Sequence, residues 1–104
     1  MKPQNYQFPL DAIAAFCQKW RIVEFALFGS VLRDDFGPDS DIDALVRFAP
    51  DTHYSLFTYA GMENELSDLL GRPVDMVDRK AIEQSANWLR RREILGTAEV
   101  LYAA

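Results

Sequence analysis

The spacing of apolar residues predicts two amphipathic helices. Residues 10–20 carry apolar side chains at the i, i+3, i+4 and i+7 positions of one helix face, namely Leu10, Ile13, Ala14 and Cys17. Residues 55–70 repeat a helical pattern. Its apolar positions are Leu56, Tyr59, Ala60, Leu66, Leu69 and Leu70. Gly71 is suited to end this second helix, and Pro73 prevents it from continuing.

Three shorter segments predict strands. Residues 23–28 are nearly all apolar, which is typical of a strand that helices cover on both faces. Residues 41–48 alternate, so that Asp41, Asp43, Leu45 and Arg47 share one face and Ile42, Ala44, Val46 and Phe48 share the other. Residues 74–77 form a third, short strand.

The remaining segments complete a layered arrangement. We expect a short helix over residues 31–36, a turn over 37–40, and a mostly helical stretch over 79–102 with a break near Asn87 or Gly96. This order predicts an α/β (α+β) fold, with a small mixed sheet of three to four strands flanked by helices. We expect a single domain over residues 1–104, in which residues 1–8 form a loose arm.

Composition and charge narrow the classes of function. The 49% hydrophobic and 26% charged content of the 104 residues is that of a soluble globular protein. The single cysteine, Cys17, and single histidine, His53, exclude an internal disulfide and a Cys/His zinc site. No apolar run reaches the ~20 residues of a membrane span, and the start lacks a signal-peptide core, so we expect a cytoplasmic protein. The net charge of −5 disfavours a long nucleic acid as partner, although a cation could bridge to a small anionic ligand.

Acidic residues gather around the second predicted strand. Five aspartates fall within ten residues: Asp34, Asp35, Asp39, Asp41 and Asp43. The last two stand on one strand face, ~7 Å apart, with their carboxylates pointing the same way. Such a pair is costly unless a cation lies between its members, and hard oxygen ligands suit Mg²⁺ or Mn²⁺. The alternative is simple solvation of a strand end.

The preceding turn favours a binding site over simple solvation. Gly29 and Ser30 end a buried strand and begin a predicted helix, where free N–H groups and a close backbone approach suit a phosphate. Arg33 follows about one turn later and could bind a phosphate through both arms of its guanidinium. Together with the aspartate pair, these residues predict a site for a polyanion and a metal.

A phosphoryl-transfer centre with two metals needs a third carboxylate, for which Asp75 and Asp78 are the candidates. Val74 and Met76 alternate as the packed face of their strand, which places Asp75 on the opposite face. This is the face of Asp41 and Asp43 if the two strands are neighbours. Strand parity therefore favours Asp75 over Asp78.

These motifs resemble the polymerase-beta-like nucleotidyltransferase superfamily, whose signature is Gly-Ser followed ten residues later by Asp-x-Asp. The strings at residues 27–33, 39–43 and 71–77 are similar to its minimal nucleotidyltransferase branch, and the resemblance covers roughly residues 10–102. It implies an enzyme of that fold. Asp34 and Ala44 depart from the commonest pattern, but neither change removes a ligand.

The resemblance also assigns roles to the motif residues. It implies that Asp41, Asp43 and Asp75 are catalytic and bind two Mg²⁺ ions, with Mn²⁺ as a substitute, and that ATP is the substrate. The nucleotide-binding residues that it implies are Gly29, Ser30, Arg33 and Ser40.

Finally, the resemblance indicates a partner. Small members of the branch are often antitoxins that transfer AMP to a tyrosine of a HEPN-type toxin, and some act by binding alone. Both activities are therefore expectations for this chain. A small-molecule nucleotidyltransferase and a nucleic-acid polymerase are weaker alternatives. An apolar C-terminal helix and two tryptophans, Trp20 and Trp88, favour a homodimer or a hetero-oligomer.

Overall fold

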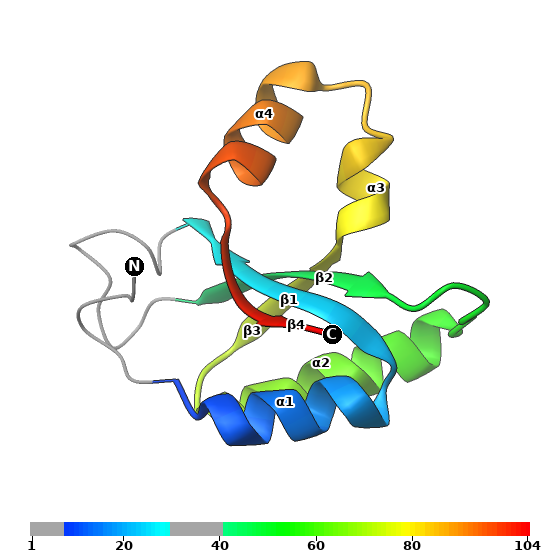
Figure 1. The fold of residues 1–104 in the computed structure, drawn as a ribbon, viewed down its shortest axis with the longest axis vertical. Helices are drawn as coiled ribbons and strands as arrows, with labels where there is room; N and C mark the ends of the chain where they lie inside the picture. The colour runs from blue at the N-terminus through cyan, green and yellow to red at the C-terminus, as the bar shows by residue number, and fades with distance from the viewer. Residues whose placement is uncertain (1–7, 30–40) are drawn as a thin grey trace.

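The computed structural model describes residues 8–29 and 41–104. Four helices and four strands lie in these residues (Figure 1). In chain order they are α1 (Leu10–Lys19), β1 (Ile22–Phe28), β2 (Ile42–Phe48), α2 (Leu56–Leu70), β3 (Val74–Asp78), α3 (Arg79–Glu83), α4 (Trp88–Thr97) and β4 (Glu99–Ala103). The short helix predicted over 31–36, the turn over 37–40 and all but the last residue of the N-terminal arm lie outside the described residues.

The strands form one mixed four-stranded sheet in the order β3-β2-β1-β4. β1 pairs antiparallel with β2 on one side and with β4 on the other, whereas β2 and β3 run parallel. β1 therefore ends at the end of the sheet where β2 and β3 begin. This architecture confirms the predicted fold class.

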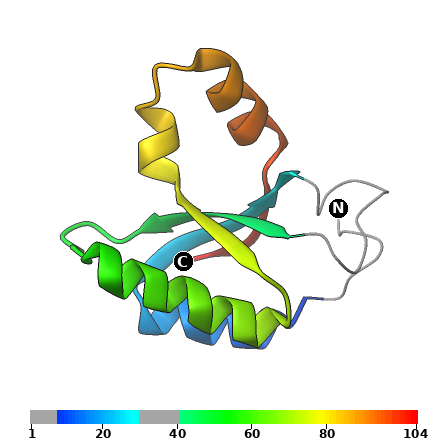
Figure 2. The ribbon, with the colours of Figure 1, turned by 180° about the vertical axis from the view of Figure 1, so that it is seen from behind.

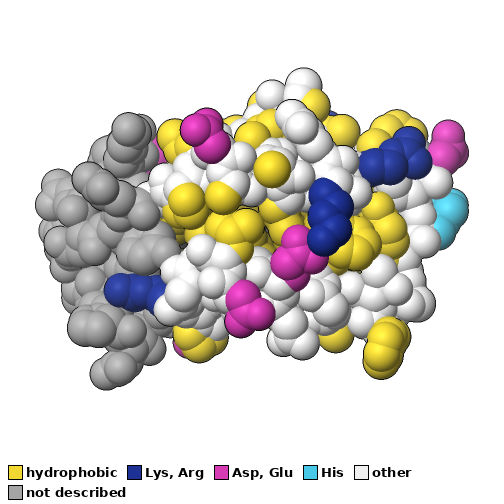
Figure 3. All heavy atoms as spheres, turned by 90° about the horizontal axis from the view of Figure 1, so that it is seen from below, with side chains coloured by type: hydrophobic (Ala, Val, Ile, Leu, Met, Phe, Trp, Pro, Cys, Tyr) yellow, Lys and Arg dark blue, Asp and Glu magenta, His cyan; other side chains and the backbone are white. Residues whose placement is uncertain are grey.

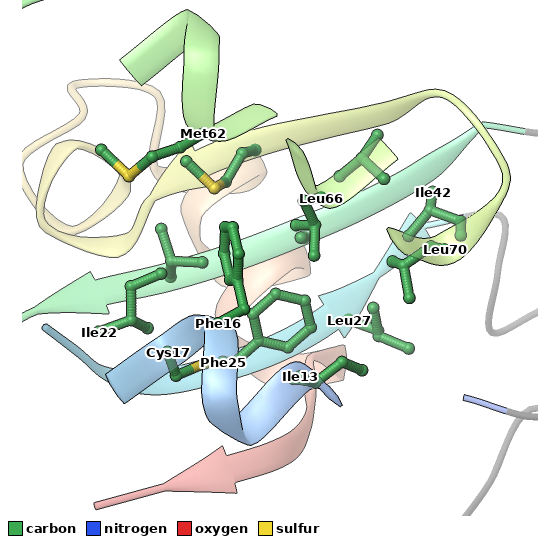
Figure 4. Close-up of a cluster of buried hydrophobic side chains, with 14 residues drawn as sticks. Ile13, Phe16, Cys17, Ile22, Phe25, Leu27, Ile42, Met62, Leu66 and Leu70 are labelled. Carbon is green, nitrogen blue, oxygen red and sulfur yellow. The ribbon is translucent and has the colours of Figure 1, made fainter. Parts of the chain in front are cut away.

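Helices cover both faces of the sheet. α1 and α2 lie side by side on one face, and α3 and α4 lie on the other (Figures 1 and 2). Phe25 and Leu27 of β1 belong to the cluster under α1 and α2, which Figure 4 shows in close-up. Ala26 and Phe28 belong to a smaller cluster with Ile82 of α3 and Ile94 of α4. The apolar character of β1 thus reflects burial on both sides, as predicted.

The ends of α2 follow local sequence signals. The hydroxyl of Ser55 accepts a hydrogen bond from the Thr58 N–H at 3.1 Å, which caps the first turn. Gly71 adopts the left-handed conformation, with a φ of 73°, and its N–H donates to the Ser67 carbonyl at 2.8 Å. The predicted boundaries of 55–70 therefore hold to within one residue.

The predicted apolar face of α2 needs a correction. Leu56 was expected on the packed face, but 89% of its surface is exposed. The buried residues of this helix are Met62, Leu66 and Leu70. The packed face is therefore rotated, because the contact with the sheet selects the stripe around Leu66. Figure 3 shows the outer side of α1 and α2, where hydrophobic and charged side chains alternate.

The prediction of mostly helical structure over residues 79–102 is wrong at its end. α3 is only five residues long, and α4 begins after Asn87, whose side chain accepts from the Arg90 N–H at 3.1 Å. The break therefore lies near Asn87, and Gly96 is inside α4. Glu99–Ala103 form strand β4 instead of a C-terminal helix. Without β4, the backbone of β1 would lack partners along one edge, and pairing supplies them.

Within the described parts of the chain, no helix has the length and apolar content to cross a membrane.

Candidate active site

The strand register brings two of the predicted aspartates together. Asp43 of β2 lies directly opposite Asp75 of β3 in the parallel pairing, and directly opposite Phe28 of β1 on its other side. Register partners point to the same face, and neighbouring strands are ~4.8 Å apart. The two carboxylates therefore leave the sheet side by side. Asp43 is half-buried, whereas Asp75 is exposed.

Asp41 lies at the same end of the sheet. It immediately precedes β2, two residues before Asp43, and is exposed. Asp41 is thus close to Asp43 along the chain, and Asp75 is close to Asp43 across the strand pairing.

Asp78 stands in a different environment. Its register partner is Val46, three positions further along β2 than Asp43, or ~10 Å away. Its carboxylate accepts a hydrogen bond from the Lys80 N–H at 2.9 Å and caps α3. The assumption that β2 and β3 are neighbours is confirmed, and the geometry groups Asp75, not Asp78, with Asp43.

Gly29 allows the Asp43 carboxylate to lie against the backbone. Gly29 directly follows β1 and has a φ of 77°, which L-residues with a side chain rarely adopt. A Cβ atom at this position would overlap Oδ2 of Asp43 and would lie 3.3 Å from its Cγ. The carboxylate thus occupies the space that a side chain at residue 29 would fill. Glycine is required here for both conformation and volume.

Three of the predicted nucleotide-binding residues, Ser30, Arg33 and Ser40, lie outside the described residues. Their predicted roles therefore stay predictions.

The acidic group suits a divalent cation by its chemistry. Carboxylate oxygens are the ligands that Mg²⁺ and Mn²⁺ prefer. In residues 8–29 and 41–104, no three acidic, histidine or cysteine side chains form a ready metal cluster. Mg²⁺ is commonly held by one or two carboxylates together with substrate phosphates. The pair Asp43 and Asp75 fits this mode of binding, in which the nucleotide completes the coordination.

Sequence reasoning missed a set of side chains that hold β3. Tyr59, Glu63 and Ser67 of α2 make hydrogen bonds to the backbone of Val74 and Met76. Burial raises the pKa of Tyr59 above its ordinary value, with smaller effects from Asp78, Glu63 and Asp75. The Tyr59 hydroxyl therefore stays protonated and able to donate. The i, i+4, i+8 spacing of these three residues places them on one face of a helix, but it does not indicate that a strand lies along that face.

Comparison with known proteins gives a consistent result. A family model described as a nucleotidyltransferase domain matches residues 11–101. A candidate protein adenylyltransferase of Methanocaldococcus jannaschii is 41% identical over 66 residues, which are 64% of this chain and 65% of that protein. A second one from the same organism is 37% identical over 62% of this chain and 64% of that protein. The matched region thus spans just under two thirds of these relatives.

Solved structures share the fold. A candidate minimal nucleotidyltransferase is 32% identical, with a TM-score of 0.65, over 86% of this chain and 85% of that chain. A toxin–antitoxin structure with AMP-PNP has a TM-score of 0.71 and 18% identity, over 93% of this chain and 75% of that chain. A complex of the tri-AMPylated HEPN toxin of Shewanella oneidensis with its MNT antitoxin has a TM-score of 0.62 and 18% identity, over 91% and 70%. At 18% identity, the likeness concerns the fold.

Proposed function

Because the chain belongs to the nucleotidyltransferase domain family, in its minimal nucleotidyltransferase branch, we propose that it transfers AMP from ATP to a hydroxyl group of a partner protein. The observation that carries this proposal is the register of Asp43 with Asp75 beside Gly29. Two neighbouring carboxylates at this end of the sheet would hold the metal ions of a bound triphosphate. The match to candidate protein adenylyltransferases supports a protein as the acceptor.

In the proposed reaction, the acceptor oxygen attacks the α-phosphorus of ATP. A bond forms between that oxygen and phosphorus, the bond to the bridging oxygen breaks, and pyrophosphate leaves with the electron pair. Asp41, Asp43 and Asp75 would hold two Mg²⁺ ions, or Mn²⁺ in their place. When bound, such ions neutralise the triphosphate and make the attacking hydroxyl more acidic.

The chain's own groups have distinct tasks in this scheme. Asp75, the more exposed carboxylate of the pair, is placed to accept the proton of the acceptor hydroxyl. Gly29 leaves room for the Asp43 carboxylate against the backbone, because no side chain stands there. Ser30, Arg33 and Ser40 would contact the triphosphate and offset its charge, as the family resemblance implies.

We propose a tyrosine of a HEPN-type toxin as the acceptor, which makes the chain an antitoxin within a hetero-complex. The complex of an AMPylated HEPN toxin with an antitoxin of this fold supports the pairing. A binding-only antitoxin is the second candidate. It is supported by solved toxin–antitoxin structures of this fold.

Label transfer from ATP distinguishes the two candidates. The chain is incubated with Mg²⁺, the product of the neighbouring gene as acceptor, and ATP labelled on either the α- or the γ-phosphate. We expect transfer of the α-label only, and a loss on the order of 10²–10³-fold in the Asp41→Asn, Asp43→Asn variant. Asp51→Asn is the matched control, because Asp51 is an exposed aspartate that follows β2, at the other end of that strand from Asp41 and Asp43.

The opposite results identify the alternative. Transfer that is undiminished in the double variant would refute the assigned site. Absence of any label, with a stable complex that still neutralises the partner, would favour the binding-only antitoxin.

A further inference from the structure

β3 is an edge strand whose outer edge is occupied by side chains instead of by another strand. Among residues 8–29 and 41–104, β3 pairs with β2 and with no other strand. On its other side, the Glu63 carboxylate accepts a hydrogen bond from the Met76 N–H at 2.7 Å, and the Tyr59 hydroxyl donates to the Met76 carbonyl at 2.7 Å. The Ser67 hydroxyl accepts from the Val74 N–H at 3.0 Å. One stripe of α2 thus bonds the outward-facing N–H groups of Val74 and Met76 and the Met76 carbonyl.

These contacts flank the carboxylate that the proposed reaction needs. Asp75 lies between Val74 and Met76, and its own backbone faces β2, because alternate residues of a strand face opposite neighbours. The peptide groups before and after Asp75 are therefore held from the outer side, while β2 holds the strand from the inner side. An N–H bond to an ionised carboxylate is among the stronger hydrogen bonds.

The holding side chains are themselves fixed. The Ser67 hydroxyl also donates to the Glu63 carbonyl at 2.8 Å, within α2. The Tyr59 ring makes an edge contact with Phe48 of β2, with centroids 6.2 Å apart. Contacts within α2 and with β2 therefore fix the side chains of Ser67 and Tyr59. Their hydrogen bonds in turn restrict the movement of β3 around Met76.

We propose that Tyr59, Glu63 and Ser67 are positioning residues that fix the backbone around Asp75 and so hold its carboxylate opposite Asp43. The inference rests on the proposed function, in which Asp75 is the third carboxylate. A purely structural role, protection of a sheet edge, would use the same outward-facing residues, so the variants below must separate it from the positioning of Asp75. The contacts observed are at the two neighbours of Asp75.

The test compares variants of two glutamates on the same helix. Glu63→Ala removes the acceptor for the Met76 N–H, whereas Glu63→Gln keeps an oxygen at that place. Glu65→Ala is the control, since Glu65 accepts from Lys19 at 2.9 Å and from the Trp20 ring N–H at 3.3 Å, away from β3. Tyr59→Phe removes a single hydroxyl and remains useful if Glu63→Ala fails to fold.

Four quantities are measured for each variant: kcat and KM for AMP transfer, the Mn²⁺ affinity in the presence of a non-hydrolysable ATP analogue, and hydrogen exchange at the Met76 amide. For Glu63→Ala we expect kcat to fall on the order of tenfold or more, with KM for ATP nearly unchanged, because misplacement of a catalytic group acts on the chemical step. We also expect Mn²⁺ binding several-fold weaker and faster exchange at Met76. Glu63→Gln should recover most of kcat, and Tyr59→Phe should lose a few-fold.

The outcomes separate this inference from the proposed function. If the wild type transfers AMP but Glu63→Ala and Tyr59→Phe match Glu65→Ala in kcat and Mn²⁺ affinity, the positioning role is refuted and the proposed function stands. If the wild type transfers nothing, yet Mn²⁺ affinity still depends on Glu63 and not on Glu65, the proposed function fails and the positioning role stands. If neither transfer nor Mn²⁺ binding occurs, both are refuted.

Discussion

Replacing Gly29 by alanine tests whether the backbone at the end of β1 sets the position of Asp43. Alanine at a φ of 77° is strained, at a cost of about 1–2 kcal/mol for a left-handed L-residue. Its Cβ would also overlap Oδ2 of Asp43. The carboxylate lies at the end of a side chain that can rotate, so the overlap is relieved by moving Asp43 instead of the backbone. The stability cost stays modest, while the carboxylate leaves its place opposite Asp75.

A second glycine provides a control for the strain alone. Gly71 has a φ of 73°, nearly that of Gly29, but no atom lies within 4 Å of where its Cβ would be. Gly71→Ala therefore carries the same backbone penalty without displacing any side chain. The two variants should lose similar free energies of unfolding, about 1–2 kcal/mol each. For a domain of this size, 1 kcal/mol lowers Tm by about 4–8 °C.

The two variants should differ sharply in transfer activity. A displacement of ~1 Å at a catalytic group can lower the rate ~100-fold, so we expect kcat/KM of Gly29→Ala to fall by about that factor. Gly71→Ala should stay within about twofold of the wild type at a temperature where both variants are folded. Urea unfolding gives the stabilities, and transfer of the α-label gives the rates. Full activity in Gly29→Ala, or an equal loss in Gly71→Ala, would show that the position of Asp43 does not depend on Gly29.

Two further predictions concern Asp78 and Cys17. Asp78→Ala should lower the free energy of unfolding by ~1 kcal/mol through loss of the α3 cap, with AMP transfer within a few-fold of wild type. Asp75→Asn should instead lower AMP transfer ~100-fold. Urea unfolding and label transfer measure the two effects, and the reverse pattern would exchange the roles of the two aspartates. Burial raises the pKa of Cys17 from 9.0 to about 12, so the unfolded thiol ionises first and the free energy of unfolding falls by ~1.4 kcal/mol per pH unit between these values. Cys17→Ala should lack this decrease in urea titrations between pH 9 and 10, below the range in which the raised pKa of Tyr59 adds a decrease of its own, and identical slopes in that interval would contradict the assignment.

The elements that the sequence predicted correctly are those with strong local signals. The second helix has a capping serine at its start and a left-handed glycine at its end, and both act within one turn. β1 and β2 could be predicted because six or seven residues in each carry the continuous or alternating apolar pattern of a strand buried in a sheet. The grouping of Asp75 with Asp43 followed from strand parity, which needs only the knowledge that two strands are neighbours.

The missed features depend on partners that are distant in the chain. Glu99–Ala103 follow a helix and carry four apolar residues in a row, a pattern that fits a helix as well as a strand. Pairing with β1, more than seventy residues earlier, decides between them. Leu56 was misplaced for a related reason. The helical spacing defines several overlapping stripes, and the contact with the sheet selects the one that is buried.

Glu63 illustrates why part of the candidate site was beyond prediction. A glutamate in the middle of an amphipathic helix is normally a solvent-facing residue. Its carboxylate gains a specific partner only because β3 returns beside α2 and exposes the Met76 N–H there. Nothing within a few residues of Glu63 indicates this, so the contact could be found only from the arrangement of α2 and β3 in space.

The connection between β2 and β3 explains why these features occur together. Parallel neighbours cannot be joined by a tight turn, so the chain must cross over, and α2 is the crossover. The helix that brings β3 into register with β2 consequently runs along β3 and can bond to its outer edge. A slip of one residue in that register would turn Asp75 to the opposite face of the sheet. Bonds from Tyr59, Glu63 and Ser67 to Val74 and Met76 oppose such a slip, because shifted backbone groups would no longer meet these side chains. The same crossover therefore both creates the pairing of Asp43 with Asp75 and secures it.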